Sequence, residues 1–138
     1  MVKHEAAFQT QFGKWVKYNW QKSTLFELKY SETETLPFAA VKAHQIQNLL
    51  NAKHRKVFWK ISDFSPEQKP ADCFLIARAQ GYLVIAYAPK EDKNDTFIMI
   101  DIDDFVKEMN TSTRKSLTLT RARQIGKEYR LGVIYKSF

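Results

Sequence analysis

The sequence has a single cysteine, Cys73, among its 138 residues. One cysteine excludes a disulfide within the chain and a zinc site built from several cysteines. Long hydrophobic runs are also missing. The longest, such as those at 81–88 and 96–100, fall far short of the roughly 20 apolar residues that a membrane-spanning helix requires. We therefore expect no membrane partner.

A secretory signal is not evident either, because the stretch MVKHEAAFQTQF has no apolar core. We expect an intracellular, cytoplasmic protein. With 44% hydrophobic and 14% aromatic residues, a chain of this length can bury one core of its own. It contains no internal repeat and no low-complexity segment, so the sequence predicts one domain over residues 1–138.

Acidic residues are scarce toward the C-terminus. The chain carries 22 Lys and Arg against 15 Asp and Glu, a net charge of +7. After Thr113 one acid, Glu128, accompanies seven basic residues, which leaves a net charge of only +1 for residues 1–113. Lys and Arg release counterions from phosphate backbones, so this pattern is typical of polyanion binding; a solvated basic tail is the alternative. The basic residues of this segment, about 114–138, are Arg114, Lys115, Arg121, Arg123, Lys127, Arg130 and Lys136.

Hydrophobic periodicity predicts a helix, a strand and a second helix, followed by several strands and terminal helices. Pro37 suits the first turn of a helix, Asp103 or Asp104 can cap one helix, and Thr118 or Thr120 another. This order predicts an α/β domain whose mixed sheet is covered by helices. The expected helices are 5–18, 37–52, a short one after 102, and one from about 118 over TLTRARQIGKEYRL, residues 118–131. The expected strands are 24–30, 56–62, a hairpin over 73–88 whose second arm is central, 96–102, and a last strand in 132–138.

The strand TLFELKY, residues 24–30, places an acid and a base on one face. Side chains alternate along a strand, so Glu27 and Lys29 point the same way. Either the two face water as a pair, or they line a pocket. Metal-dependent hydrolysis of a phosphodiester uses carboxylates to hold Mg²⁺ and a cation near the developing negative charge. A second carboxylate is not close in sequence, since residues 6–26 contain no Asp or Glu. Asp72, which follows Pro70 at the entrance of a strand, is the best candidate.

These motifs resemble a known family. FELK, then LPF and a helix with HQIQNL, and later KPADCFLI, together resemble the PD-(D/E)xK nuclease superfamily, especially its RecU-type Holliday junction resolvases. The resemblance covers about residues 5–106 and implies a restriction-endonuclease-like mixed sheet in a single domain. It also implies Mg²⁺ as cofactor, and whether Mn²⁺ can replace Mg²⁺ stays open. In most of that superfamily the Asp precedes Glu-x-Lys, whereas Asp72 follows it by more than forty residues.

The resemblance also implies roles for individual residues. Glu27 and Asp72 would bind the metal, Lys29 would orient water or stabilise the phosphorus centre, Gln45 would support the site, and Glu5 would face the metal or a second ion. Other interpretations stay open. Glu5 can offset a helix dipole, Gln45 can be solvated, and Asp72 can stabilise a turn. Asp63 can replace Asp72, or the site can be inactive.

The function implied is an endodeoxyribonuclease selective for branched or four-way junction DNA, acting as a homodimer because two symmetric incisions need two sites. Such an enzyme would suit a phage or a microbe. The basic segment would track the DNA backbone without reading sequence, and Lys53, Arg55 and Lys56 form a second expected contact. Two alternatives are a non-catalytic nucleic-acid-binding module with the same fold and a restriction-type enzyme with sequence preference; the basic segment could also bind RNA.

Overall fold

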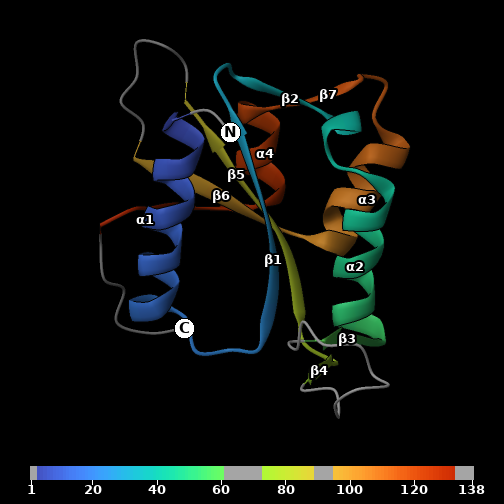
Figure 1. Ribbon diagram of the computed structural model, residues 1–138. Helices are drawn as coiled ribbons and strands as arrows, with labels where there is room; N and C mark the ends of the chain where they lie inside the picture. Colours follow the sequence, from blue (N-terminus) through green and yellow to red (C-terminus); the bar gives the residue numbers. More distant parts are fainter. Residues whose placement is uncertain (1–2, 61–72, 89–94, 133–138) are drawn as a thin grey trace.

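The fold is known from a computed structural model that describes residues 3–60, 73–88 and 95–132 (Figure 1). The chain begins with a helix, two strands, a 3₁₀ turn and a second helix, and four successive strands follow before the last two helices. In order, the elements are α1 Lys3–Asn19, β1 Thr24–Ser31, β2 Thr35–Pro37, a 3₁₀ turn Phe38–Ala40, α2 Ala43–His54, β3 Lys56–Lys60, β4 Cys73–Ala77, β5 Gln80–Tyr87, β6 Thr96–Asp101, α3 Ile102–Thr111, β7 Ser116–Thr118, α4 Leu119–Ile125 and β8 Lys127–Arg130.

The main sheet has four strands in the order β1-β5-β6-β8. β1 and β5 are parallel, and the other two pairs are antiparallel, so the sheet is mixed. β2 pairs with β7, and β3 with β4, as two separate antiparallel ribbons. The prediction of an α/β domain with a mixed sheet flanked by helices is thus confirmed. β5 lies in the interior of the sheet and is apolar on both faces, as predicted.

Helix α1 covers one face of the sheet. Its apolar residues Phe8, Phe12 and Trp15 recur at intervals of four and three, which aligns them on a single stripe. Phe97 of β6 packs edge-on against this stripe, with ring centroids 5.2 Å from Phe12 and 4.9 Å from Trp15. Phe26 of β1 lies 5.1 Å from Phe12 in a similar geometry. This face of β1 is therefore held by aromatic packing.

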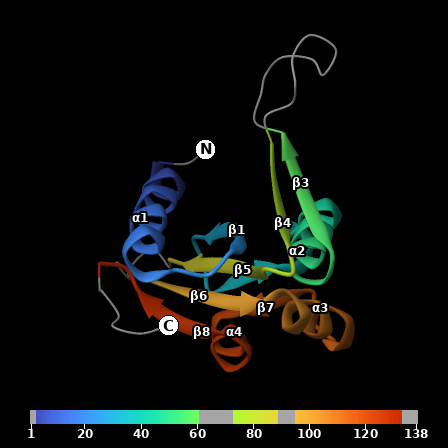
Figure 2. The same cartoon turned by 90° about the horizontal axis from the view of Figure 1, so that it is seen from below.

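Helices α2, α3 and α4 pack against the opposite face, where the larger apolar cluster lies. α2 approaches β5 so closely that a Cβ at Gly81 would lie 2.5 Å from the carbonyl oxygen of Leu49, which explains a glycine inside a central strand. Figure 2 shows α1 on one side of the sheet, and the β3–β4 ribbon projecting from the side of α2.

Several local predictions are wrong. The expected hairpin over 73–88 does not form, because β4 pairs with β3 while β5 pairs with β1 and β6. Arg78 and Ala79 connect β4 to β5, and their backbone N–H groups donate hydrogen bonds to the carbonyls of Arg55 and Ala52 at the end of α2. The helix from 118 ends at Ile125, and β8 follows within the expected helical range. Asp101, rather than Asp103 or Asp104, caps α3, whereas Thr118 caps α4 as predicted. The last strand expected in 132–138 lies almost wholly outside the described residues.

Candidate functional site

Glu27 and Lys29 lie side by side on the face of β1 that is turned toward α2. Their register partners on β5 are Leu83 and Ile85, both fully buried. The Lys29 Nζ is 3.6 Å from the Glu27 Oε1. The Glu27 side chain is 29% exposed and the Lys29 side chain 18%. The pair is mostly covered rather than freely solvated, which is the geometry expected of a polar pair at the margin of an apolar sheet.

Gln45 has a structural role at the start of α2. Its side-chain carbonyl accepts a hydrogen bond from the backbone N–H of Lys42 at 2.9 Å. This bond satisfies one of the otherwise unpaired donors at the helix N-terminus. Among the described residues, no hydrogen bond or ion pair joins Gln45 to Glu27 or Lys29.

Glu5 lies in the first turn of α1, where its carboxylate offsets the positive end of the helix dipole. α1 packs against the face of β1 formed by Phe26, Leu28 and Tyr30, whereas Glu27 points to the other face. The sheet therefore stands between α1 and the face that carries Glu27.

Asp72, the second predicted carboxylate, lies outside the described residues, as does its alternative Asp63. The chain is described again from Cys73, the first residue of β4, which pairs with Lys60 at the end of the ribbon. Over residues 3–60, 73–88 and 95–132, no three His, Cys, Asp or Glu residues gather to hold a metal ion. The described part of the candidate site thus contributes one carboxylate and one ammonium.

An ion-pair cluster between α2 and α3 was not predicted. Lys53 Nζ donates to both Asp101 carboxylate oxygens, at 2.8 and 2.9 Å, and also to Asp103. His54 Nε2 lies 2.9 Å from Asp103. Partial burial alone would lower the pKa of Lys53, but the bonds with Asp101 and Asp103 raise it above its usual value. Lys53, one of the expected nucleic-acid contacts, is therefore engaged by two acids.

Substituting Asp103 by Asn should lower stability in a pH-dependent way. The hydrogen bond from Lys53 lowers the pKa of Asp103, burial opposes that shift, and His54 adds to it. A carboxyl with a lowered pKa stabilises the fold above its unfolded pKa of about 4 and loses this contribution as pH falls through the folded pKa. Because Asp103 is 42% exposed, solvent screening limits the expected loss at pH 7 to about 1 kcal/mol or less.

Urea unfolding at a series of pH values from 7 downward measures this difference, which should shrink as the pH falls through the lowered pKa of Asp103. Asp104→Asn is the matched control, because Asp104 also lies in the first turn of α3 and is exposed. A pH-independent loss in Asp103→Asn, or an equal loss in the control, would contradict the assigned ion pair.

The basic C-terminal segment is structured rather than a solvated tail as far as Gly132. Arg121 makes a two-pronged ion pair with Glu108, at 2.8 and 3.0 Å, and Arg123 Nε lies 3.1 Å from Glu128. Lys127 Nζ sits 5.0 Å from the centre of the Tyr129 ring. Arg130 faces Asp95 at 3.8 Å. Lys136 lies outside the described residues.

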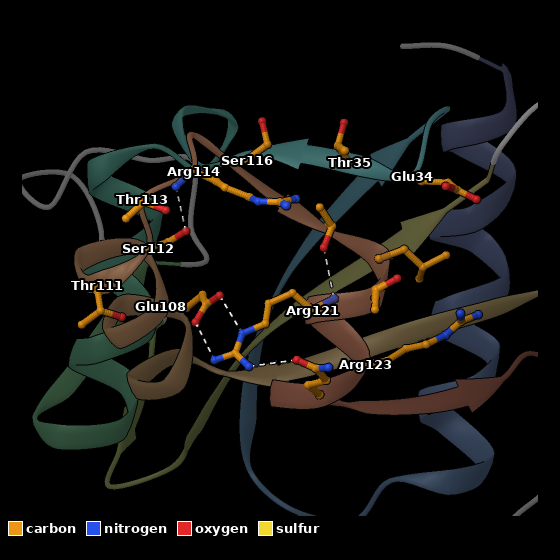
Figure 3. Close-up of a pocket in the computed structure, with 14 residues that line it drawn as sticks. Glu34, Thr35, Glu108, Thr111, Ser112, Thr113, Arg114, Ser116, Arg121 and Arg123 are labelled. Atoms are coloured by element: carbon orange, nitrogen blue, oxygen red, sulfur yellow. Dashed lines mark hydrogen bonds and ion pairs between the residues drawn. The ribbon is translucent and has the colours of Figure 1, made fainter.

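Arg114 and Lys115 are exposed like these residues, but neither has an ion pair or a ring contact with another described residue. Arg114 lines a polar groove of about 800 Å³ between the end of α3, the β2–β7 ribbon and α4 (Figure 3). The Ser- and Thr-rich run 111–120 is the sequence signal for this groove, which was not predicted. Its lining is Glu34, Thr35, Glu108, Thr111, Ser112, Thr113, Arg114, Ser116, Thr118, Leu119, Thr120, Arg121, Arg123 and Gln124.

Comparison with known proteins gives no family for this chain. No family model, no curated protein and no solved structure matches it. In the described part of the chain, no helix is long and apolar enough to cross a membrane. The functional assignment must therefore rest on the residues of the site.

Proposed function

We propose that the protein is a Mg²⁺-dependent endonuclease that hydrolyses DNA phosphodiesters, with a restriction-endonuclease-like fold and a preference for branched or four-way junction DNA. The observation that carries the proposal is the pair of Glu27 and Lys29, 3.6 Å apart on one face of β1. A carboxylate and an ammonium at this separation combine a metal ligand with a cation that can stabilise a phosphorane.

The donor set fits Mg²⁺ in kind, since Mg²⁺ uses one or two protein carboxylates and takes its other ligands from water and phosphate. Glu27 would be one carboxylate and Asp72 the second; Mn²⁺ would substitute. Bound there, the metal would polarise the phosphoryl oxygen and lower the pKa of a coordinated water. Glu27 also orients Lys29, whose ammonium would hold the attacking water or the negative charge that develops on phosphate.

Basic side chains near the C-terminal end support binding of the DNA backbone. Arg114 and Lys115 are exposed and have no acidic partner among the described residues. Contacts of this kind position DNA without reading its sequence, which suits a structure-selective enzyme better than a sequence-specific one. Arg121 and Arg123 are paired with acids and would contribute less net charge. Lys127 and Arg130 would extend the contact along β8.

The first experiment incubates the protein with a labelled four-way junction and with a linear duplex of matched sequence, in Mg²⁺ and in EDTA. We expect cleavage of the junction in Mg²⁺ alone, and loss of cleavage in Asp72→Asn. Cleavage that survives this substitution would mean that Asp63 or another acid, rather than Asp72, supplies the second carboxylate for the metal. Cleavage of the linear duplex at one sequence would instead indicate a restriction-type enzyme.

A non-catalytic nucleic-acid-binding module is the second candidate. The polar groove with the exposed Arg114 favours it. Junction binding without cleavage in either Mg²⁺ or Mn²⁺ would select this function. Comparing the affinity for RNA and DNA of the same sequence would then identify the nucleic acid.

A further inference from the structure

β1 is a long edge strand with little protection against pairing. It forms one end of the four-stranded sheet and, among the described strands, pairs with β5 alone (Figure 2). The other edge strand, β8, has four residues, of which Lys127, Glu128 and Arg130 are charged. Short, charged strands resist edge-to-edge pairing. β1 has eight residues and only two charges, so it lacks this protection.

The backbone groups that β1 presents to its open edge follow from its pairing with β5. The carbonyls of Ser23 and Ser31 accept hydrogen bonds from β5 and from the residue after it. In a parallel pair, every second residue directs both its N–H and its C=O to the neighbouring strand. The odd-numbered residues of β1 therefore bond β5. Phe26, Leu28 and Tyr30 direct their backbone N–H and C=O groups outward, and no described segment pairs with them.

The charges on β1 complement those on a second, antiparallel copy of β1. If a second β1 lies antiparallel with its Leu28 opposite Leu28, then Glu27 stands opposite the partner's Lys29 and Lys29 opposite the partner's Glu27. On the other face, Phe26 stands opposite the partner's Tyr30. Opposite charges and aromatic pairs both stabilise adjacent antiparallel strands.

The backbone supports the same register. Leu28 opposite Leu28 and Phe26 opposite Tyr30 are hydrogen-bonded pairs, because these residues direct both groups outward. Glu27 opposite Lys29 is then a non-hydrogen-bonded pair, in which the side chains are closer. If the two-fold axis between the strands passed through residue 27 instead of Leu28, Glu27 would stand opposite Glu27. If it passed through residue 29, Lys29 would stand opposite Lys29. Like charges directly opposite one another are destabilising, so the charges disfavour both neighbouring symmetric registers.

We propose that β1 is a homodimer interface, in which the β1 strands of two copies pair antiparallel about Leu28 and join the two sheets into one. The two Glu27–Lys29 pairs then form a single cluster of alternating charge on one face of the joined sheet. The closed two-fold arrangement satisfies both open edges at once. This inference does not depend on nuclease activity, since the pairing uses backbone geometry and charge alone.

Charge exchange tests this interface. Glu27→Lys leaves four lysines in the cluster, and Lys29→Glu leaves four carboxylates. By sedimentation equilibrium we expect the dissociation constant of each homodimer to rise at least about 100-fold. Mixing the two variants should restore a heterodimer, because the lysines of one chain then face the carboxylates of the other. The double variant Glu27→Lys/Lys29→Glu should dimerise like the unmodified protein, although it should not cleave DNA.

Asp104→Lys and Lys107→Glu make the same charge changes at exposed residues of α3, away from β1, and we expect both to leave the dimer unchanged. A monomer at all concentrations up to several hundred micromolar would overturn the proposal. So would single variants that dimerise normally, or a mixture that remains monomeric.

A cross-link provides a second measurement if a single charge variant does not fold. In a Cys73→Ser background, Leu28→Cys should form an intermolecular disulfide on oxidation, because the two Cα atoms would lie about 5.5 Å apart. Phe26→Cys is the control and should not cross-link, since the partner's Tyr30 stands opposite it. Equal cross-linking of the two variants, or none in Leu28→Cys, would reject the register.

Discussion

Replacing Lys29 by Ala should reduce cleavage of four-way junction DNA at least about 100-fold, because removing a group that stabilises developing negative charge typically costs a factor of 10²–10³ in rate. The Lys29 side chain lies 3.6 Å from Glu27 and is only 18% exposed, so bulk water would replace it poorly. Glu27→Gln should have a comparable or larger effect, since it removes the negative charge that would bind the metal while retaining the shape of the side chain.

The measurement is a single-turnover rate with the protein in excess over a labelled junction, together with the junction affinity in EDTA. We expect the rate to fall and the affinity to change little, because one lysine contributes little to binding compared with the basic C-terminal segment. Lys107→Ala serves as the control, since Lys107 is exposed on α3 and away from β1. The oligomeric state of each variant should be measured in parallel, so that a weakened dimer is distinguished from a lost catalytic group.

Two results would count against the assigned pair. A normal rate in Lys29→Ala would remove Lys29 from the mechanism. Equal losses of rate and affinity would mean that Lys29 contributes to DNA binding or dimerisation rather than to the chemical step.

Replacing Phe97 by Ala should lower the free energy of unfolding by about 3–5 kcal/mol, the usual cost of truncating a buried Phe. Phe97 is 1% exposed and lies at the centre of the cluster under α1. Its ring meets Phe12 at 5.2 Å and Trp15 at 4.9 Å, both edge-on, and stacks on Tyr129 at 5.6 Å. The substitution therefore removes aromatic contacts between α1 and the sheet in addition to apolar burial.

Denaturant unfolding followed by far-UV circular dichroism measures this loss. Phe58→Ala is the matched control, because Phe58 lies on β3 with 63% of its surface exposed. We expect the control to change stability by no more than about 0.5 kcal/mol. Equal effects at the two positions would mean that α1 does not pack on β6 as described.

The sequence alone determined the local pattern of this protein. The spacing of Phe8, Phe12 and Trp15 defines one face of a helix, since a helix returns to the same side every three to four residues. The alternation in β1 places Glu27 and Lys29 on one side by covalent geometry alone, whatever the strand pairs with. The sequence also placed the start of α4 at Thr118 or Thr120, and Thr118 is the cap, since its side chain accepts a bond from the backbone N–H of Arg121.

Only the tertiary structure decided which distant segments meet. The apolar run of β5 fits a hairpin with β4 as well as a parallel pairing with β1, and packing against α2 through Gly81 accompanies the second arrangement. Arg121, which looks like part of a free tail in sequence, instead meets Glu108 in another helix, and Lys53 meets Asp101, 48 residues further along the chain. Such contacts join residues that the sequence separates, so no local pattern encodes them. The role of Asp72 stays a prediction from sequence, whereas the position of β1 at the edge of the sheet is set by the folded chain alone.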